Sequence, residues 1–276
     1  MKMISVTASI VLFRHTPQDL NKTLDSLTNQ PEVSRIILVD NGGSDWANDI
    51  RDSRFHYIKA PYNIGFGRAH NLAIRQFADK SDYFIICNPD INFGKSTIKA
   101  ILDEVENYPA GLYMPQIAYP DGSRQELCKL LPSPIDLFAR RFFPPLAKFT
   151  DPHYLLQHAD FNQPFFAPSL SGCFMFCRST ALIALDGFDE RFFMYMEDVD
   201  LARRFADNYG TCYIPVATVC HEFQKDSYKK TKLLKYHIIS TIKYFNKWGW
   251  FFDKGRRNLN KKCLSMLPTM LDNTKK

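Results

Sequence analysis

Strand-like and helix-like segments alternate from residue 5 to about residue 105, and this alternation restricts the fold more than any other feature. A β-branched run at 5–13 is followed by Thr16 and Pro17, which suit an N-cap and a first helical turn, and then by leucines at helical spacing. Further strand-like segments occupy 35–41, 55–60 and 83–87, with helix-like segments near 67–79 and after Ser96. Such alternation predicts an α/β fold with a mostly parallel central sheet flanked by helices.

Two of these predicted strands end in acidic and amide residues. Asp40 and Asn41 close the second strand-like segment, and Asn88 and Asp90 follow the segment 83–87. In a parallel sheet a ligand binds beyond the carboxyl ends of the strands, so both carboxylates would share one rim, where a nucleotide and a divalent cation could meet. An ordinary turn role is the alternative for either aspartate alone.

A third acidic group lies late in the chain, in "FFMYMEDVDLARR" (192–204). Glu197 and Asp198 follow aromatic and methionine residues and precede apolar residues at helical spacing. They therefore fall at a helix start, where backbone N–H groups and the helix dipole stabilise carboxylates. One interpretation is a plain helix cap. The other is a general base at the floor of a mostly dry pocket, which also accounts for the hydrophobic run.

Phosphate-binding motifs of other enzyme classes are missing from the sequence. There is no GxxxxGK[ST] loop, and "NIGFGRAHN" (63–71) has a GxG without the full dinucleotide fingerprint after the first strand. Hydride transfer and P-loop phosphoryl transfer are therefore disfavoured. Arg68 and Asn71, in this segment, are candidate contacts to a nucleotide.

The alternation stops between residues 111 and 168. Two short strands are predicted around Pro120, Asp121 and Gly122, and the prolines, phenylalanines and basic residues that follow predict a loop or lid at about 125–168. A plain surface insertion is the alternative. An apolar strand and a short helix from Ser179 then follow.

Composition restricts the cellular setting. The seven cysteines are odd in number and unevenly spaced, which favours reduced, buried residues and a cytoplasmic protein. We find no secretory signal and no run of about 18–20 apolar residues that would span a bilayer. The net charge of +6 suits an anionic ligand or a membrane surface.

Aromatic and basic residues are interleaved near the C-terminus, at 232–262. Trp248, Trp250, Phe251 and Phe252 lie among lysines and arginines, which is typical of an interfacial helix on an anionic membrane. A helix that packs its aromatic residues on the main domain is the alternative. Nucleic-acid binding is disfavoured, because no recognised module accompanies the segment.

Six segments in order resemble the family 2 glycosyltransferases, especially bacterial rhamnosyltransferase-like members. They are "SIVLF", "LVDNGGSD", "NIGFGRAHN", "NPDI", "SGCFMFCR" and "GFDERFFMYMEDVDLARR", and together they cover about residues 5–225. The resemblance implies a GT-A nucleotide-diphospho-sugar transferase fold over 1–225, followed by a C-terminal helical segment at 226–276.

The resemblance also implies roles for individual residues. Asp40 would contact the nucleotide base, with Asn41 beside it in the nucleotide-sugar site. "NPD" stands where the family has its DxD motif, so Asp90 would bind the cation, while Asn88 replaces the first acid and leaves fewer anionic ligands. Asp198, next to Glu197, would be the base that deprotonates the acceptor hydroxyl.

Two residues further on complete this site. His221 would lie near the cation or the diphosphate, and Lys229 would reach the same phosphates. A satisfied strand-end histidine and a solvated lysine are the alternatives. The cofactor implied is Mg²⁺ or Mn²⁺, which would neutralise the leaving diphosphate.

The resulting prediction is an inverting glycosyltransferase of bacterial surface polysaccharide synthesis, such as O-antigen or capsule. The resemblance implies dTDP-L-rhamnose as donor and a polyprenyl-diphosphate-linked oligosaccharide as acceptor, reached by peripheral contact with the cytoplasmic membrane face. A UDP-hexose donor and an inactive sugar-nucleotide-binding scaffold subunit are the alternatives. A nucleotidyltransferase is disfavoured, because no basic nucleotide-binding loop lies near the first strand.

Overall fold

The computed structural model describes residues 4–142, 151–222 and 231–267 of the 276-residue chain. Strands and helices alternate at first, as β1 (Val6–Leu12), α1 (Pro17–Thr28), β2 (Val33–Asp40), η1 (Asp45–Asp49), β3 (Phe55–Lys59), α2 (Phe66–Phe77), η2 (Ala78–Lys80), β4 (Tyr83–Cys87), β5 (Ile91–Phe93), α3 (Thr97–Glu104) and β6 (Leu112–Ala118). The later elements are β7 (Cys128–Lys129), α4 (Pro134–Phe142), β8 (Ser169–Leu170), β9 (Phe174–Arg178), α6 (Ser179–Ala184), α7 (Glu197–Asn208), β10 (Thr211–His221), α8 (Thr231–Trp248) and α9 (Lys254–Met266).

One large sheet organises the described residues. Its eight strands follow the order β3-β2-β1-β4-β9-β6-β10-β5. The strands β3, β2, β1 and β4 run parallel to one another, and β6 runs parallel to β10. Strand β9 lies antiparallel between β4 and β6, and β5 lies antiparallel to β10. The predicted α/β fold with a mostly parallel sheet is therefore confirmed.

The carboxyl ends of β2 and β4 lie on either side of the end of β1. Asp40 is in register with Leu12 of β1, and Cys87 is in register with Ile10. Because the three strands are parallel, Asp40 and the turn at 88–90 leave the sheet at the same rim.

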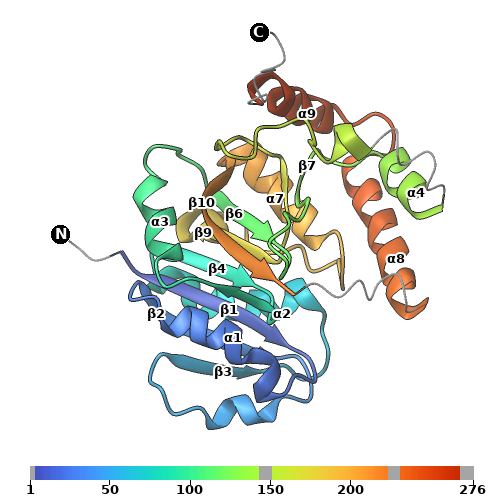
Figure 1. Ribbon diagram of the computed structural model, residues 1–276. Helices are drawn as coiled ribbons and strands as arrows, with labels where there is room; N and C mark the ends of the chain where they lie inside the picture. The colour runs from blue at the N-terminus through green and yellow to red at the C-terminus, as the bar shows by residue number, and fades with distance from the viewer. Residues whose placement is uncertain (1–3, 143–150, 223–230, 268–276) are drawn as a thin grey trace.

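Helices cover both faces of the sheet. The crossover from β1 through α1 leads to β2, and the crossover from β3 through α2 leads back across β1 to β4. Right-handed crossovers in opposite directions place their helices on opposite faces, and Figure 1 shows α1 in front of the sheet and α2 behind it. Strands β1 and β4 are consequently buried along their whole length.

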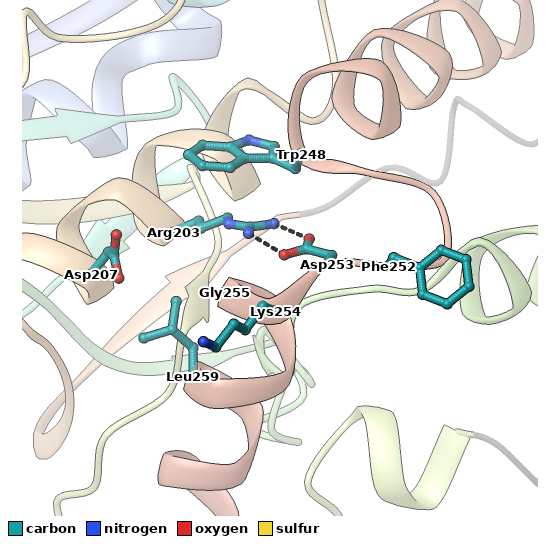
Figure 2. Close-up of a pocket in the computed structure, with 8 residues that line it drawn as sticks. All are labelled: Arg203, Asp207, Trp248, Phe252, Asp253, Lys254, Gly255 and Leu259. Atoms are coloured by element: carbon teal, nitrogen blue, oxygen red, sulfur yellow. Dashed lines mark hydrogen bonds and ion pairs between the residues drawn. The ribbon is translucent and has the colours of Figure 1, made fainter.

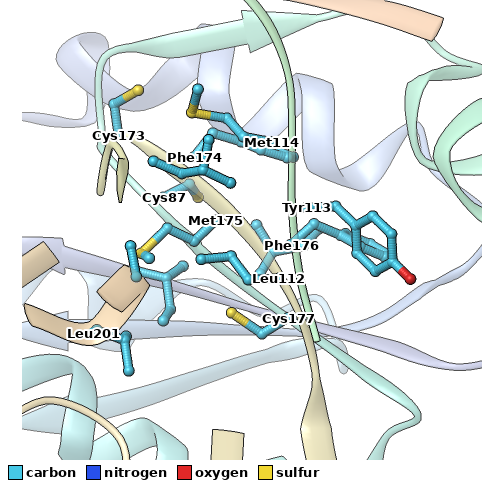
Figure 3. Packing of buried hydrophobic residues seen from close by; sticks show 14 of the residues in the cluster. Cys87, Leu112, Tyr113, Met114, Cys173, Phe174, Met175, Phe176, Cys177 and Leu201 are labelled. Carbon is cyan, nitrogen blue, oxygen red and sulfur yellow. The ribbon is translucent and has the colours of Figure 1, made fainter. Parts of the chain in front are cut away.

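Part of the hydrophobic core lies around β9, where the antiparallel strand joins the two parallel parts of the sheet (Figure 3). Phe174, Phe176 and Cys177 are fully buried there, beside Cys87 of β4. All seven cysteines are free, and six of them are buried. This confirms the prediction of reduced, packed cysteines.

The middle of the chain is more ordered than predicted. The expected second strand after Gly122 is wrong, because the return of the chain makes only a single bridge, between Arg124 and Ala118. Within the predicted loop at 125–168, β7 pairs with β8, and Tyr154 and Leu155 are buried in the main core. Residues 143–150 lie outside the described part of the chain.

An ion pair joins the C-terminal helices to the main domain. Arg203 of α7 binds both carboxylate oxygens of Asp253, at 2.6 and 2.7 Å, and both side chains are buried (Figure 2). The Trp248 ring stacks on the same guanidinium, 4.0 Å from the Cζ atom of Arg203. Trp248 therefore packs on the main domain, whereas Phe251 and Phe252 are 70% and 92% exposed.

Helices α4, α8 and α9 gather at one end of the molecule, away from β3 (Figure 1). None of the helices in the described ranges has both the length and the apolar character needed to cross a membrane.

Candidate functional site

A cavity of about 1160 Å³ contains four of the residues that the sequence singles out. Asn88, Glu197, Asp198 and His221 line it, although they come from distant parts of the chain. The other lining residues are Phe66, Tyr119, Arg124, Gln125, Glu126, Leu127, Lys129, Leu137, Tyr154, Ser171, Gly172, Cys173, Met194, Tyr195, Met196, Val199, Leu234 and His237. The cavity thus has an acidic side and a largely apolar side.

Helix α1 and the loop before β9 hold the turn after β4. The Thr23 hydroxyl lies 2.6 Å from the Pro89 carbonyl oxygen and 2.7 Å from that of Ile91. The Asn88 N–H donates to the Cys173 carbonyl oxygen at 2.9 Å. Because both ends of the turn are tied to the core, Asn88 and Asp90 are held at a fixed place on the rim.

His221 ends β10 directly opposite Ile91, and so lies beside this turn. Its Nε2 atom is 3.4 Å from Asp90 Oδ1. Its Nδ1 atom is 3.0 Å from Oε1 of Gln125, whose amide nitrogen donates to the carbonyl oxygens of Ala118 and His221. Since Gln125 Oε1 can only accept, Nδ1 carries a proton and Nε2 faces Asp90. No sequence motif singles out Gln125.

Opposite charges face each other at this rim. Burial lowers the pKa of His221, but Asp90 and Cys173 raise it more, to about 10. Burial raises the pKa of Asp90, and the neighbouring His221 lowers it by more, so the net shift is downward. The two side chains therefore form a charge pair.

The same rim fits a divalent cation. Asp90 Oδ1 is buried and accepts no hydrogen bond, and the oriented His221 Nε2 lies next to it. Within the described ranges no group of three or more His, Cys, Asp or Glu side chains could hold a metal. Mg²⁺ is commonly bound by one or two carboxylates together with substrate phosphates, so this sparse donor set suits a cation that arrives with a diphosphate.

The two residues that precede α7 have a strained backbone conformation. Tyr195 and Met196 both have left-handed backbone, with φ of 68° and 66°, which costs about 1–3 kcal/mol for each residue. This turn brings the chain from the apolar run straight into α7. As predicted, Glu197 and Asp198 are the first two residues of that helix.

The two acids of this helix start have different environments. Asp198 accepts N–H groups on both oxygens, from Gly172 at 3.0 Å and from Val199 at 2.9 Å. Glu197 is only 5% exposed, and its Oε2 atom has no hydrogen-bond partner. Burial and the nearby Asp198 charge raise the pKa of Glu197 to about 8. The charged form of Glu197 is therefore disfavoured, and Asp198, which is oriented by two N–H groups, is the candidate base.

Gly172 permits the close contact between the loop and Asp198. A Cβ atom at residue 172 would lie 2.9 Å from Cβ of Asp198, which is too close for two carbon atoms. The next residue, Cys173, accepts the Asn88 N–H. One loop thus fixes the candidate base relative to the turn that carries Asp90.

Helix α8 holds the strained segment from the other side. Ser240 donates to the Met194 carbonyl oxygen at 2.8 Å. Lys247 binds Asp200 at 2.5 Å, and the Trp248 indole N–H donates to the same carboxylate at 2.8 Å. These α8 residues carry no recognisable motif in the sequence, so their link to the acidic helix start appears only in the structure.

The predicted nucleotide contacts near β2 lie outside the cavity lining. Asp40 is 1% exposed and accepts the N–H groups of Gly42 and Ser44 and the hydroxyl of Tyr57. Asn41 binds the backbone of Ile64 and Gly65. Both side chains therefore organise the loops at this rim, and a contact with the nucleotide base stays a prediction.

The other predicted nucleotide contacts are also occupied. The Asn71 amide accepts from the Phe188 N–H and donates to the Phe188 carbonyl and to Glu190. Arg68 pairs with Glu190 at 3.3 Å. Lys229 lies outside the described residues. These three nucleotide contacts stay predictions.

Comparison with known sequences points to one family. The profile of the family described as glycosyl transferase family 2 matches residues 9–181. The chain is 32% identical over 212 residues to the N-acetylglucosaminyl-diphospho-decaprenol L-rhamnosyltransferase of Mycobacterium tuberculosis (strain ATCC 25618 / H37Rv), covering 71% of this chain and 68% of that relative. It is 25% identical over 255 residues to rhamnosyltransferase WbbL of Escherichia coli (strain K12), and the match covers 85% of this chain and 91% of WbbL.

Solved structures are similar in fold. GalNAc-T7, solved with UDP, GalNAc and Mn²⁺, has a TM-score of 0.64 at 10% identity; the match covers 92% of this chain and 49% of GalNAc-T7, so this chain spans about half its length. The mannosyltransferase PcManGT from Pyrobaculum calidifontis, in complex with GDP-Man and Mn²⁺, has a TM-score of 0.58 at 14% identity. The match covers 94% of this chain and 74% of PcManGT. These similarities confirm the predicted GT-A fold.

The raised pKa of Glu197 predicts how stability depends on pH. The bound proton stabilises the fold fully below about pH 4.5, and this stabilisation is lost as pH rises through about 8. Glu197→Gln cannot ionise, so between about pH 6 and 8.5 the wild type should lose about 2 kcal/mol of unfolding free energy relative to the variant. Urea unfolding at the two pH values measures the difference. Glu106→Gln, at an exposed site, is the control, and parallel pH curves for wild type and Glu197→Gln would contradict the prediction.

Proposed function

The chain belongs to glycosyl transferase family 2, and on this premise we propose that it transfers L-rhamnose from dTDP-L-rhamnose to a polyprenyl-diphosphate-linked sugar acceptor. The chain is a glycosyltransferase similar to bacterial rhamnosyltransferases. The names of the two relatives support the rhamnosyl group, and the name of the mycobacterial relative supports an acceptor sugar joined through diphosphate to a polyprenol. The proposed setting is bacterial surface polysaccharide synthesis, such as O-antigen or capsule.

The observation that carries the proposal is a fixed carboxylate beside a buried, unpartnered acid in one cavity. Asp198 is held by two N–H groups and lines the cavity, and Glu197 lines it too, with its Oε2 atom buried and without a hydrogen-bond partner. Because burial and the nearby Asp198 raise the pKa of Glu197 and so disfavour its charged form, Asp198 is the acid placed to accept the proton of the acceptor hydroxyl. A scaffold subunit would not require this arrangement, which disfavours the non-catalytic alternative.

The reaction follows as a single displacement with inversion at the anomeric carbon. The acceptor hydroxyl oxygen forms the new bond to that carbon, its proton passes to Asp198, and the bond from the carbon to the diphosphate oxygen breaks. The nucleoside diphosphate leaves with the electron pair of that bond. The fixed backbone contacts of Asp198 keep the base oriented without reorganisation during the step.

Asp90 would ligate a divalent cation directly, and His221 would join it after releasing its Nε2 proton, because a metal-ligating imidazole nitrogen must be deprotonated. Bound there, Mg²⁺ or Mn²⁺ would neutralise charge on the leaving diphosphate. Gln125 orients His221 for this role by accepting a hydrogen bond from its Nδ1–H group. Asn88 lies next to both residues and offers an amide in place of a second carboxylate.

The proposed location is the cytoplasmic face of the membrane, with peripheral contact through the turn between α8 and α9. Phe251 and Phe252 are the exposed tip of this turn. Exposed lysines and arginines follow them along α9: Lys254, Arg257, Lys261 and Lys262. Aromatic side chains amid basic residues suit insertion into an anionic lipid surface.

A transfer assay tests the proposed reaction. Purified protein with Mg²⁺ or Mn²⁺ would be given dTDP-L-rhamnose, UDP-glucose or UDP-GlcNAc and a synthetic N-acetylglucosaminyl-diphospho-prenol, with products followed by mass spectrometry. We expect one added deoxyhexose from dTDP-L-rhamnose and none from the UDP sugars. Transfer from a UDP sugar alone would overturn the donor assignment. Nucleotide binding without transfer from any donor would favour the scaffold.

Replacement of the base should separate chemistry from donor binding. Asp198→Asn nearly preserves shape but removes the proton acceptor, so kcat should fall by about 10²–10⁴-fold while the Kd for dTDP stays unchanged. Steady-state kinetics and calorimetry measure the two quantities. Asp207→Asn, an exposed aspartate on the same helix, is the matched control and should behave as wild type. A wild-type kcat in Asp198→Asn would contradict the assignment of Asp198 as the general base.

Loss of the aromatic tip should weaken membrane binding. The double variant Phe251→Ser with Phe252→Ser removes two exposed apolar side chains, and sedimentation with vesicles of mixed neutral and anionic lipid should recover less protein than with wild type. Tyr62→Ser, at a residue 67% exposed elsewhere on the surface, is the control. Equal sedimentation of the double variant and wild type would contradict the proposed contact.

A further inference from the structure

Arg124 is a charged residue without a polar partner inside the large cavity. Its guanidinium carbon lies 3.3 Å from the centroid of the Phe161 ring. Its Nη1 atom is buried and has no hydrogen-bond partner, and the described residues give this side chain no ion pair. The side chain is only half-buried, but a buried guanidinium nitrogen without an acceptor is unfavourable, so the position suits an anion that binds from the cavity.

The guanidinium is held in place before any ligand binds. Phe161, on which it stacks, packs edge-on against Phe165 and Tyr213, at ring distances of 5.2 and 5.3 Å. The backbone of Arg124 bridges to Ala118 at the end of β6. A fixed, planar guanidinium presents paired N–H donors that match phosphate oxygens.

The neighbouring cavity wall indicates the kind of molecule that carries this anion. Leu127 and Leu137 come from the same part of the chain as Arg124, and Leu234 of α8 adds a further apolar side chain. Asp198 lies in the same cavity. One cavity thus holds the candidate base, the Arg124 cation and several apolar side chains, and a molecule with a sugar, a diphosphate and a hydrocarbon chain would use all three.

We propose that Arg124 binds the diphosphate of a prenyl-diphosphate-linked acceptor. This deepens the proposed function and rests on it for the identity of the acceptor. The donor is also a diphosphate, and its own phosphates are expected at the turn that carries Asn88 and Asp90. The apolar side chains next to Arg124 favour the acceptor over the donor, because a nucleotide sugar has no hydrocarbon chain to place there.

A binding experiment tests this without requiring sugar transfer. Farnesyl diphosphate and dTDP would be titrated separately into wild type, Arg124→Gln, Arg124→Lys and the control Arg51→Gln, whose arginine is exposed. We expect Arg124→Gln to bind farnesyl diphosphate about tenfold more weakly or worse, because a charge-assisted contact is lost. Its dTDP affinity should stay at the wild-type value. Arg124→Lys should bind farnesyl diphosphate with intermediate affinity, since lysine keeps the positive charge but lacks the paired N–H donors of the guanidinium.

The other outcomes overturn the proposal. Weaker dTDP binding with unchanged farnesyl diphosphate binding would assign Arg124 to the donor. Unchanged binding of both ligands, or wild-type protein that does not bind farnesyl diphosphate, would exclude the subsite. Thermal unfolding of each variant shows whether loss of stacking on Phe161 has unfolded it, and in that case the comparison of wild type with Arg124→Lys decides.

Failure of this inference differs from failure of the proposed function. If wild type transfers rhamnose and Arg124→Gln keeps the wild-type acceptor KM, the proposed reaction is supported and the proposed diphosphate subsite at Arg124 is rejected. If farnesyl diphosphate binds through Arg124 but no donor gives a product, the subsite stands and the reaction does not.

Discussion

The contact between the Gly172 backbone and the Asp198 carboxylate is the constraint on which the site depends. The N–H of Gly172 fixes one carboxylate oxygen at 3.0 Å, and the loop approaches so closely that a Cβ atom at residue 172 would overlap Asp198. The same loop accepts the Asn88 N–H through Cys173. The turn after β4 and the start of α7 are thereby held at a fixed separation, although more than a hundred residues lie between them in the sequence.

Electrostatics then assigns different states to two neighbouring acids. Glu197 is buried without a partner for Oε2, so its charged form is unfavourable, while Asp198 receives two N–H groups and faces the cavity. The strained backbone at 195–196 makes this division possible, because it turns the chain abruptly into α7. Packing from α8 maintains the strained backbone through contacts with Met194 and Asp200.

The aromatic residues of the C-terminal segment divide into a packed group and an exposed group. Trp248 stacks on Arg203, whose buried ion pair with Asp253 joins the helices to α7. Phe251 and Phe252, three and four residues further along, are exposed instead. The aromatic residues on one side thus support the acidic helix start, and those on the other are available to a lipid surface. A lipid-linked acceptor would bring both sides into use at once.

The amino-acid sequence alone predicts the α/β fold, the alternation of the early strands and helices, the acids at the rim and the acidic start of α7. These are encoded locally, in hydrophobic periodicity, capping residues and polar strand ends, so a single chain reveals them. It also placed Asn88, Glu197, Asp198 and His221 among the candidate residues, through a resemblance to a family.

The three-dimensional fold, in contrast, determines which candidate residues share a cavity and how each side chain is buried and hydrogen-bonded. Gln125 orients His221 and Arg124 stands unpaired because β6, β10 and the segment after Ala118 meet in space, and no local pattern records that meeting. Asp40, Asn41 and Asn71 looked equally polar in the sequence, yet the fold uses their hydrogen bonds to secure loops. Burial raises the pKa of Glu197, and the N–H of Gly172 orients Asp198, and both effects depend on residues distant in the chain.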